Sequence, residues 1–299
     1  MDNALKYLIQ QRSNEWRYDG NLVIFLYAPI IIVLSGPTHW HIDYPVCGGH
    51  KQSPININTE QVILNKSLSS FVLTGYQNIT NVNMSIQNNG HTVEIDLSGE
   101  PITLSGGGLP GTYKALQFHF HWGSKSNRGS EHLINQNHFP MEMHIVHYST
   151  RYRSFSSAMN ATDGLAIGSR NPYMDKIINH FAQISHKNDH VKIATFSLHS
   201  LLPDDLVTYY RYYGSLTTPP CFESIIWTMF TKPIEISENQ MNRFRTALHS
   251  NAHNQADRSE SDDFRPVQQL NGRVNLRRGS NSDKFGTNFI NVYMAQQTK

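Results

Sequence analysis

Three histidines on two predicted β-strands have the spacing of a metal site. His119 and His121 lie two residues apart in the aromatic-rich stretch 116–122, and alternate residues of a strand project to the same face. A neighbouring antiparallel strand carrying His144 would bring a third imidazole there, and three neutral nitrogens around one open position suit a catalytic zinc ion. The alternative is an aromatic strand with incidental histidines, because the chain contains 16 histidines and a His-x-His pattern alone is weak evidence.

Two polar residues are placed to orient these imidazoles. Gln117 lies two residues before His119, and Glu142 lies two residues before His144. A ligating imidazole needs an acceptor at its second ring nitrogen, and each polar residue shares a strand face with its histidine. The alternative for both is a solvated polar residue on a strand.

Glu131 and Thr217 are the other residues that would separate a working site from an accidental histidine pair. Thr217 lies in the segment Ser-Leu-Thr-Thr-Pro-Pro at 215–220, whose two prolines restrict their own backbone and that of Thr218. Such a stiff loop would hold a hydroxyl in one orientation. An ordinary turn is the competing interpretation.

The elements that must position these residues are mostly strands. Alternating or β-rich composition bounded by turn-forming residues predicts strands at 84–87, 92–97, 102–105, 115–122, 142–149, 192–198 and 224–230. A helix is predicted to start at Asn171-Pro172, with one apolar face formed by Met174, Ile177, Ile178, Phe181 and Ile184. Ser237 and Gln240 predict a capping box at the start of a second helix. We therefore expect a mostly β (α+β) fold with a large, mainly antiparallel central sheet and surface helices.

Composition supports a single folded domain without a nucleic-acid function. The chain has 299 residues, 38% of them hydrophobic, and carries 25 basic against 23 acidic side chains. This balance gives no electrostatic reason to bind nucleic acid or an anionic membrane. Asn-x-Ser/Thr sequons at Asn65, Asn78, Asn83 and Asn160 favour a secretory compartment. The two cysteines, Cys47 and Cys221, are compatible with free thiols, metal ligands or a disulfide.

Both ends of the chain fall outside the predicted domain. Residues 21–35 form an apolar run that is short for a membrane span and contains Pro29, so it resembles a signal-peptide core behind an unusually long leader. The tail is polar, and we expect neither a C-terminal transmembrane helix nor a lipid anchor. The expected organisation is a leader or insertion-bearing segment at 1–36, one domain at 37–277 and a polar tail at 278–299.

Taken together, the motifs resemble those of the α-class carbonic anhydrases, and the resemblance runs from residue 37 to about 277. It is carried by Gln-Ser-Pro-Ile at 52–55, Asn-Asn-Gly-His at 88–91, Gln-Phe-His-Phe-His-Trp-Gly at 117–123, Gly-Ser-Glu-His at 129–132, Glu-Met-His-Ile-Val-His at 142–147, Ser-Leu-Thr-Thr-Pro-Pro at 215–220 and Phe-Arg-Pro at 264–266.

The resemblance implies a role for each matching residue in the hydration of carbon dioxide to bicarbonate. His119, His121 and His144 fall on the positions of the zinc ligands, and Gln117 and Glu142 on those that hold them. Glu131 and Thr217 match the pair beside the nucleophile, and His91 matches the proton shuttle. The substrate pocket would be lined by Val146, Ile167, Leu216, Thr217, Thr218 and Trp227. In secreted and membrane-bound members of the family a disulfide joins the positions of Cys47 and Cys221, which implies an extracellular location.

The chain departs from the family pattern in three places. Trp16-Arg17-Tyr18 and the segment 37–40 look like two halves of one family segment that residues 21–36 separate. That stretch is an insertion, retained extra sequence, or a signal core with a chance match at Trp16. The segment after Ile167 lacks an apolar run of about seven residues, roughly one strand. Glu94 stands where relatives often carry a neutral residue. The alternative function is therefore a catalytically impaired, extracellular binding module on the same fold.

Overall fold

The structure is a computed structural model that describes residues 16–18, 21–24, 31–34, 36–159, 161, 165–168 and 174–279. The long strands are β6 (Val82–Asn88), β7 (Val93–Gly99), β9 (Tyr113–Trp122), β11 (Met141–Ser149), β14 (Tyr209–Gly214) and β15 (Ile225–Phe230). The short strands are β1 (Asn21–Ile24), β2 (Ile31–Leu34), β3 (Asn56–Ile57), β4 (Ile63–Leu64), β5 (Phe71–Thr74), β8 (Thr103–Gly106), β10 (Leu133–Ile134), β12 (Leu165–Gly168), β13 (His190–Ile193) and β16 (Leu276–Arg278). The α-helices are α2 (Trp40–Asp43), α3 (Phe155–Met159), α4 (Asp175–Ile178) and α5 (Glu238–Thr246), and 3-10 turns span Pro45–Gly48, Phe181–Gln183 and Leu198–Leu201.

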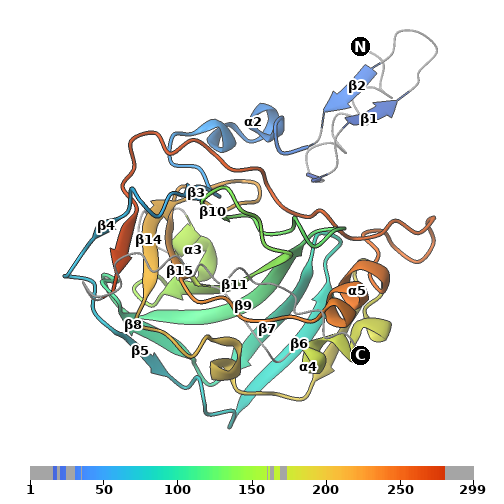
Figure 1. The fold of residues 1–299 in the computed structure, drawn as a ribbon. Coiled ribbons are helices and arrows are strands. Elements are labelled where there is room, and N and C mark those ends of the chain that lie inside the picture. The colour runs from blue at the N-terminus through green and yellow to red at the C-terminus, as the bar shows by residue number, and fades with distance from the viewer. Residues whose placement is uncertain are drawn as a thin grey trace, which may run out of the picture.

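A large twisted sheet dominates the fold, as predicted (Figure 1). Its strands follow the order β13-β6-β7-β9-β11-β12-β15-β14-β16-β4, and β5 joins through β8, which pairs with β9. The pairs are antiparallel except β12 with β15 and β16 with β4. Helices α4 and α5 contact each other at the surface near the β6 side of the sheet. The mostly β, mainly antiparallel fold class is confirmed.

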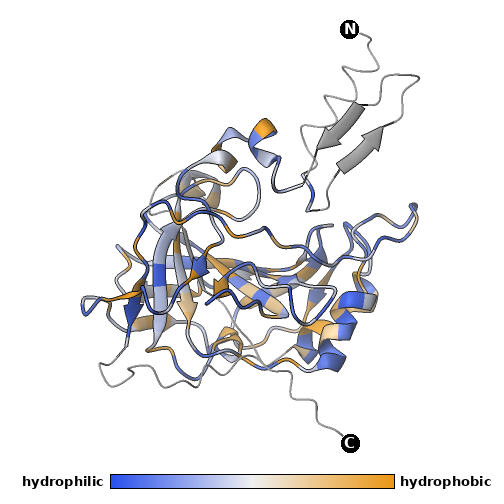
Figure 2. Ribbon diagram, turned by 45° about the horizontal axis from the view of Figure 1, so that its top comes forward, coloured by the Kyte–Doolittle hydropathy of each residue, from blue (hydrophilic) through white to orange (hydrophobic). Residues whose placement is uncertain are grey.

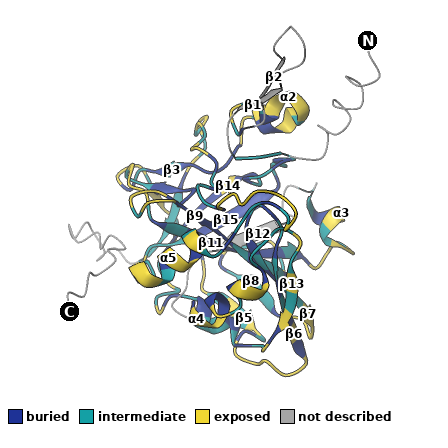
Figure 3. Cartoon of the chain, turned by 90° about the vertical axis from the view of Figure 1, so that its right-hand side faces the viewer, coloured by how far each residue is buried: buried dark blue, intermediate teal, exposed yellow. Residues whose placement is uncertain are grey.

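Strands β9 and β11 form the centre of the sheet and separate two hydrophobic cores. Phe118, Phe120 and Ile145 belong to the larger core, whereas Val146 packs in the smaller one with Trp227. This division follows from strand alternation, because neighbouring residues face opposite sides. Figure 2 shows the mixed hydropathy of the strands and the hydrophilic outer face of α5, and Figure 3 shows the buried residues concentrated in the central strands.

The predicted helices and one predicted strand need partial correction. The capping box is present at α5, where Gln240 N–H donates to Ser237 Oγ over 3.2 Å. The apolar face predicted from Met174 to Ile184 is buried, but the chain forms the short helix α4 and a separate 3-10 turn in place of one helix. Residues 171–173 lie outside the described residues. The strand predicted at 192–198 ends at Ile193, because the chain then turns into the 3-10 turn at Leu198–Leu201.

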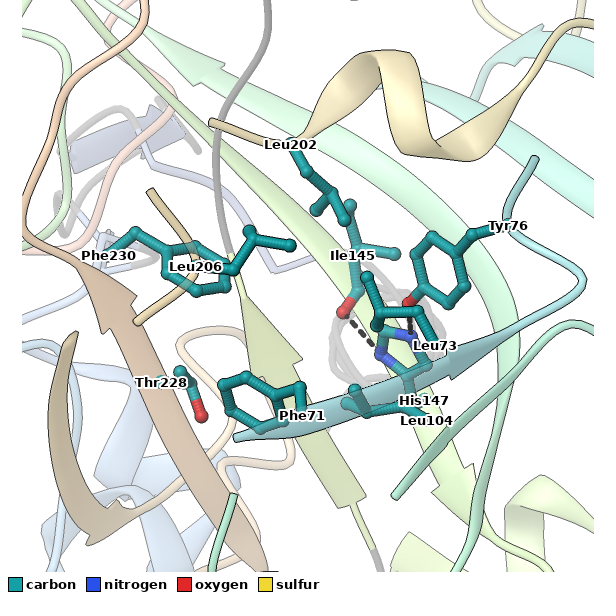
Figure 4. Close-up of a pocket in the computed structure, with 10 residues that line it drawn as sticks. All are labelled: Phe71, Leu73, Tyr76, Leu104, Ile145, His147, Leu202, Leu206, Thr228 and Phe230. Carbon is teal, nitrogen blue, oxygen red and sulfur yellow. Dashed lines mark hydrogen bonds between the residues drawn. The ribbon is translucent and has the colours of Figure 1, made fainter. Parts of the chain in front are cut away.

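Strand β12 is short compared with both of its neighbours. It pairs with β11 from Leu165↔Tyr148 to Gly168↔Ile145, and with β15 from Leu165↔Ile225 to Ile167↔Trp227. Thr228 and Phe230 lie on β15 beyond this paired region. They line an apolar pocket (Figure 4), together with Phe71, Leu73, Tyr76, Leu104, Ile145, His147, Leu202 and Leu206.

The two halves of the N-terminal motif pack together in space. Strands β1 and β2 form an antiparallel hairpin in which Asn21 pairs with Leu34, so the chain leaves and returns at one place (Figure 1). Trp16 lies 5.4 Å from Trp40 between ring centroids, and Trp40 Nε1 donates to Arg17 O over 3.0 Å. Among the described residues, no helix is long and apolar enough to cross a bilayer.

Candidate metal centre

The predicted histidines converge at the middle of β9 and β11. His144 pairs directly with His119 in the antiparallel register, and the three ring centroids are 4.7 to 5.2 Å apart. One ring nitrogen from each histidine lies within 4.8 Å of the other two. His144 Nδ1 and His119 Nε2 are 3.3 Å apart, while His121 Nε2 is buried without a hydrogen-bond partner.

The other nitrogen of each ring is held by an acceptor. His119 Nδ1 donates to Gln117 Oε1 over 2.9 Å, and His144 Nε2 donates to Glu142 Oε1 over 2.7 Å. His121 Nδ1 donates to the backbone carbonyl of Asp263 over 2.6 Å. Each outer nitrogen therefore carries the proton, and each inner nitrogen presents a lone pair.

Burial keeps the three imidazoles neutral. It lowers the pKa of His121 to about 4 and that of His119 well below its usual range, and it also lowers the pKa of His144. Burial alone would raise the pKa of Glu142, but contacts with His132 and His144 hold it well below its usual value. Neutral imidazoles with a neighbouring carboxylate are the protonation states that metal ligation requires.

The donor set fits zinc. Three imidazole nitrogens with acceptors behind them match a catalytic zinc site that keeps a fourth position open. The unpartnered, buried Nε2 of His121 is a costly group unless a ligand satisfies it. Metal binding would remove that cost.

Glu131 and Thr217 lie beside this centre. Arg265 N–H donates to Glu131 Oε1 over 2.9 Å, and Glu131 Oε2 is 3.5 Å from His121 Nε2. Burial raises the pKa of Glu131 to about 7, while the nearby His144 and hydrogen bonds with the Arg265 backbone and the Thr217 side chain oppose the rise. Thr217 is itself buried.

Apolar side chains adjoin the histidines on the same side of the sheet. Trp227 lies 4.8 Å from His144 between ring centroids, and its Nε1 donates to Ser215 O over 3.0 Å. Val146 and Leu216 pack in the same core as Trp227. Thr218 O accepts from Cys221 N–H within the loop. The backbone of Ile167 on β12 pairs with Val146 on β11 and with Trp227 on β15.

His91 lies at a turn beside the N-terminal segment. Its ring stacks on Trp16 with centroids 4.0 Å apart, and Gly90 takes a φ of +84°, a backbone conformation that favours glycine. Tyr18 also approaches the centre, because its ring centroid lies 6.4 Å from that of His121. Residues 16–18 thus occupy the rim of the centre despite their distance in sequence.

Glu94 extends the hydrogen-bond chain behind His119. Gln117 Nε2 donates to Glu94 Oε2 over 2.8 Å, and Gln87 Nε2 donates to Oε1 over 2.9 Å. Burial and the nearby Asp96 raise the pKa of Glu94 to about 7, against the lowering effect of Gln87. The carboxyl group at this position therefore fixes the amide that holds His119.

The disulfide implied by the family resemblance is present. Cys47 and Cys221 are bonded with a Cα–Cα distance of 4.9 Å. The bond joins the segment before Gln52 to the loop that carries Thr217. Arg265 strengthens the same junction, because its guanidinium donates to Gln52 Oε1, Ser53 O and Cys47 O over 2.8 to 2.9 Å.

Two residues that help to hold the site were not predicted from the sequence. Asp263 holds His121 through a backbone carbonyl, a group that every residue carries. His132 bridges Glu142 and the Tyr212 hydroxyl, with Nδ1 2.7 Å from Glu142 Oε1 and Nε2 2.6 Å from Tyr212 Oη. The match at 129–132 contained His132, but its contact with Tyr212 joins residues 80 positions apart.

A mainly antiparallel sheet in which one half-buried and two buried histidines converge from adjacent strands defines a class of β-sheet proteins with a three-histidine centre. A model of the eukaryotic-type carbonic anhydrase family matches residues 35–278. The chain belongs to this family of enzymes.

Curated relatives agree with this assignment. Carbonic anhydrase 7 of Homo sapiens is 39% identical over 250 residues, which cover 80% of this chain and 93% of that protein. Carbonic anhydrase 7 of Mus musculus is also 39% identical with the same coverage. Carbonic anhydrase 12 of Homo sapiens is 37% identical over 250 residues, which cover 80% of this chain and 70% of that protein.

Proposed function

We propose that this protein catalyses the zinc-dependent, reversible hydration of carbon dioxide to bicarbonate and a proton. His119, His121 and His144 are the proposed ligands. One observation supports this proposal most directly. The outer nitrogen of each ring donates to an acceptor, whereas the three inner nitrogens lie close to one another. When bound, zinc acidifies a coordinated water to a pKa of about 7, the value characteristic of carbonic anhydrases themselves, and so supplies a nucleophile.

Glu131 and Thr217 orient the reacting oxygen in this proposal. When Glu131 is ionised it only accepts hydrogen bonds, so the Thr217 hydroxyl donates to Glu131 and can only accept from the reacting oxygen. That fixes the direction of the attacking lone pair. The hydrogen bond from Arg265 N–H to Glu131 Oε1 keeps the carboxylate in place.

Carbon dioxide binds against the apolar wall beside the centre. Val146, Leu216 and Trp227 pack together there, and Ile167 and Thr218 are the further proposed lining residues. A small apolar substrate is accommodated better by such a surface than by charged groups. His144, 4.8 Å from Trp227 between ring centroids, brings the wall next to the ligands.

His91 carries the proton to solvent. Imidazole is the side chain whose ordinary pKa lies closest to neutral pH, and the stack on Trp16 holds this ring at the rim. Trp16 therefore positions the proposed proton carrier.

The experiment that tests the proposal measures zinc content and carbon dioxide hydration on the same purified protein. We expect hydration activity in the wild type, whereas His144→Ala should lose this activity and bind one zinc ion fewer per chain than the wild type. His138→Ala, outside the centre, is the control. Stoichiometric metal at the three histidines without hydration would favour the non-catalytic binding module, which the intact Glu131 and Thr217 argue against.

We also propose that the protein works outside the cell, with a catalytic domain at 37–277, an insertion-bearing segment at 1–36 and a polar tail at 278–299. The Cys47–Cys221 disulfide is typical of secreted proteins, and the packing of Trp16 on Trp40 supports an insertion between them. Sequon residues Asn78 and Asn83 are exposed and Asn65 is half-buried, while Asn160 lies outside the described residues. Expression in a secretory cell line should yield protein in the medium that peptide N-glycosidase shifts on a gel.

A further inference from the structure

A second cluster of metal-binding side chains lies outside the candidate metal centre and shares no residue with it. His186 follows the 3-10 turn at Phe181–Gln183, and His249 and Asp257 follow helix α5. One ligand atom from each lies within 4.8 Å of the other two. We propose that His186, His249 and Asp257 bind a second divalent transition-metal ion.

The contacts within this triad leave a nitrogen unsatisfied. His186 Nε2 lies 3.1 Å from Asp257 Oδ1, and the rings of His186 and His249 stack with centroids 4.7 Å apart. His249 Nδ1 is buried and has no hydrogen-bond partner. A buried nitrogen without a partner is unfavourable, and a metal ion at the triad would give the imidazole a bond to make.

The backbone holds the triad together without help from an ion. His249 N–H donates to Ser185 O over 2.8 Å, and Ser250 N–H donates to Arg258 O over 2.9 Å. His249 also forms an isolated bridge with Ser259. These bonds fix the residues next to all three ligands, so an ion would meet a largely preformed site.

A neighbouring pair adds negative charge but is already satisfied. His253 Nε2 lies 3.0 Å from both oxygens of Asp189, and the two residues form an alternative triad with His186. Because His249 Nδ1 is buried without a hydrogen-bond partner, we assign the ion to the triad that contains His249 and Asp257. The positively charged Arg258 follows Asp257 in the chain, and its Nε donates a hydrogen bond to Ser250 Oγ over 2.8 Å.

The donor chemistry selects the kind of ion. Two imidazoles and one carboxylate suit zinc, copper or nickel, whereas calcium and magnesium prefer sites made of oxygen ligands.

Equilibrium dialysis of the full chain against zinc, with metal content measured per chain, tests the proposal. The expected result is two ions in the wild type and one in His186→Ala, His249→Gln and His119→Ala. His190→Ala, an exposed histidine on the same segment, should keep two ions. His186→Ala should also hydrate carbon dioxide at the wild-type rate, which separates this site from the proposed function.

Three results would overturn the proposal. Wild-type protein that saturates at one ion would show that no second site exists, and His186→Ala that still holds two would show that the second ion is not bound by this triad. Loss of the second ion in His253→Gln with retention in His249→Gln would place it in the alternative triad. Circular dichroism of each variant verifies that a lost ion does not reflect a lost fold.

Discussion

Thr217 tests whether a single hydroxyl controls the proposed reaction. Thr217→Val removes the hydroxyl and leaves the shape of the side chain nearly unchanged. The variant therefore loses the group that hydrogen-bonds both to Glu131 and to the reacting oxygen. We expect kcat/KM for carbon dioxide hydration to fall on the order of 100-fold, with zinc content unchanged, in stopped-flow measurements. Thr217→Ser, which keeps the hydroxyl, should retain most activity. Equal rates for Thr217→Val and wild type would refute the orienting role.

Glu260 makes stability depend on pH. Its carboxyl group is buried, and burial raises its pKa to about 8 against the lowering effects of Asn88 and Arg258. Between the ordinary glutamate value and about pH 8 the folded state binds more protons than the unfolded state, so stability decreases as pH rises. Glu260→Gln should remove this slope and stabilise the protein at pH 8 by up to a few kcal/mol.

Urea unfolding at pH 5 and pH 8 measures the effect of Glu260. Glu238→Gln is the matched control, because Glu238 is exposed on α5. The prediction would be contradicted if the free energy of unfolding changed between pH 5 and pH 8 by the same amount in Glu260→Gln as in wild type.

At the level of single residues, sequence was informative where the geometry is local. Gln117 and Glu142 lie beside their histidines because a strand repeats every two residues. The carbonyl of Asp263 bonds to a histidine 142 positions away, and no side-chain type marks it. Sequence alone could not have identified that partner.

At the level of elements, alternation predicted β9 and β11, but tertiary packing set the boundaries elsewhere. Strand β14 was missed, although five of its six residues are buried, because Tyr-Tyr-Arg-Tyr-Tyr shows no polar alternation. Arg211 is buried there with its guanidinium on Thr228 Oγ1, a pairing that composition does not predict. The apolar residues predicted to form one helical face between Met174 and Ile184 are buried, but the helix there is shorter than predicted.

The β1–β2 hairpin should be dispensable. Asn21 and Leu34 are paired across its base, so replacing residues 21–34 by Gly-Gly would reconnect nearby chain ends. We expect kcat/KM within about twofold of wild type, since the hairpin contributes no predicted site residue. Trp16→Ala is the contrasting variant and should lose roughly 2 kcal/mol of stability, less than a fully buried tryptophan. A tenfold loss of activity on deletion would contradict this expectation.

At the level of the whole molecule, the disulfide is expected to supply much of the stability. It closes a loop between residues 174 positions apart, for which the chain-entropy model gives about 5 kcal/mol. The double variant Cys47→Ser, Cys221→Ser should show that loss in denaturant unfolding. Wild type unfolded in the presence of a reductant should give the same value. A change below about 1 kcal/mol would mean that the unfolded state is not restrained by the bond.

Residues near the C-terminal end of the domain help to hold the centre, and this has a consequence for protein synthesis. A ribosome that has translated as far as residue 260 has already made His119, His121 and His144, but neither the carbonyl of Asp263 that holds His121 nor the guanidinium of Arg265 that binds Gln52, Ser53 and Cys47. The nascent chain therefore cannot hold all three imidazoles in this way until residues 263–265 have been made. Assembly of this centre is expected to be a late step in the synthesis of the chain.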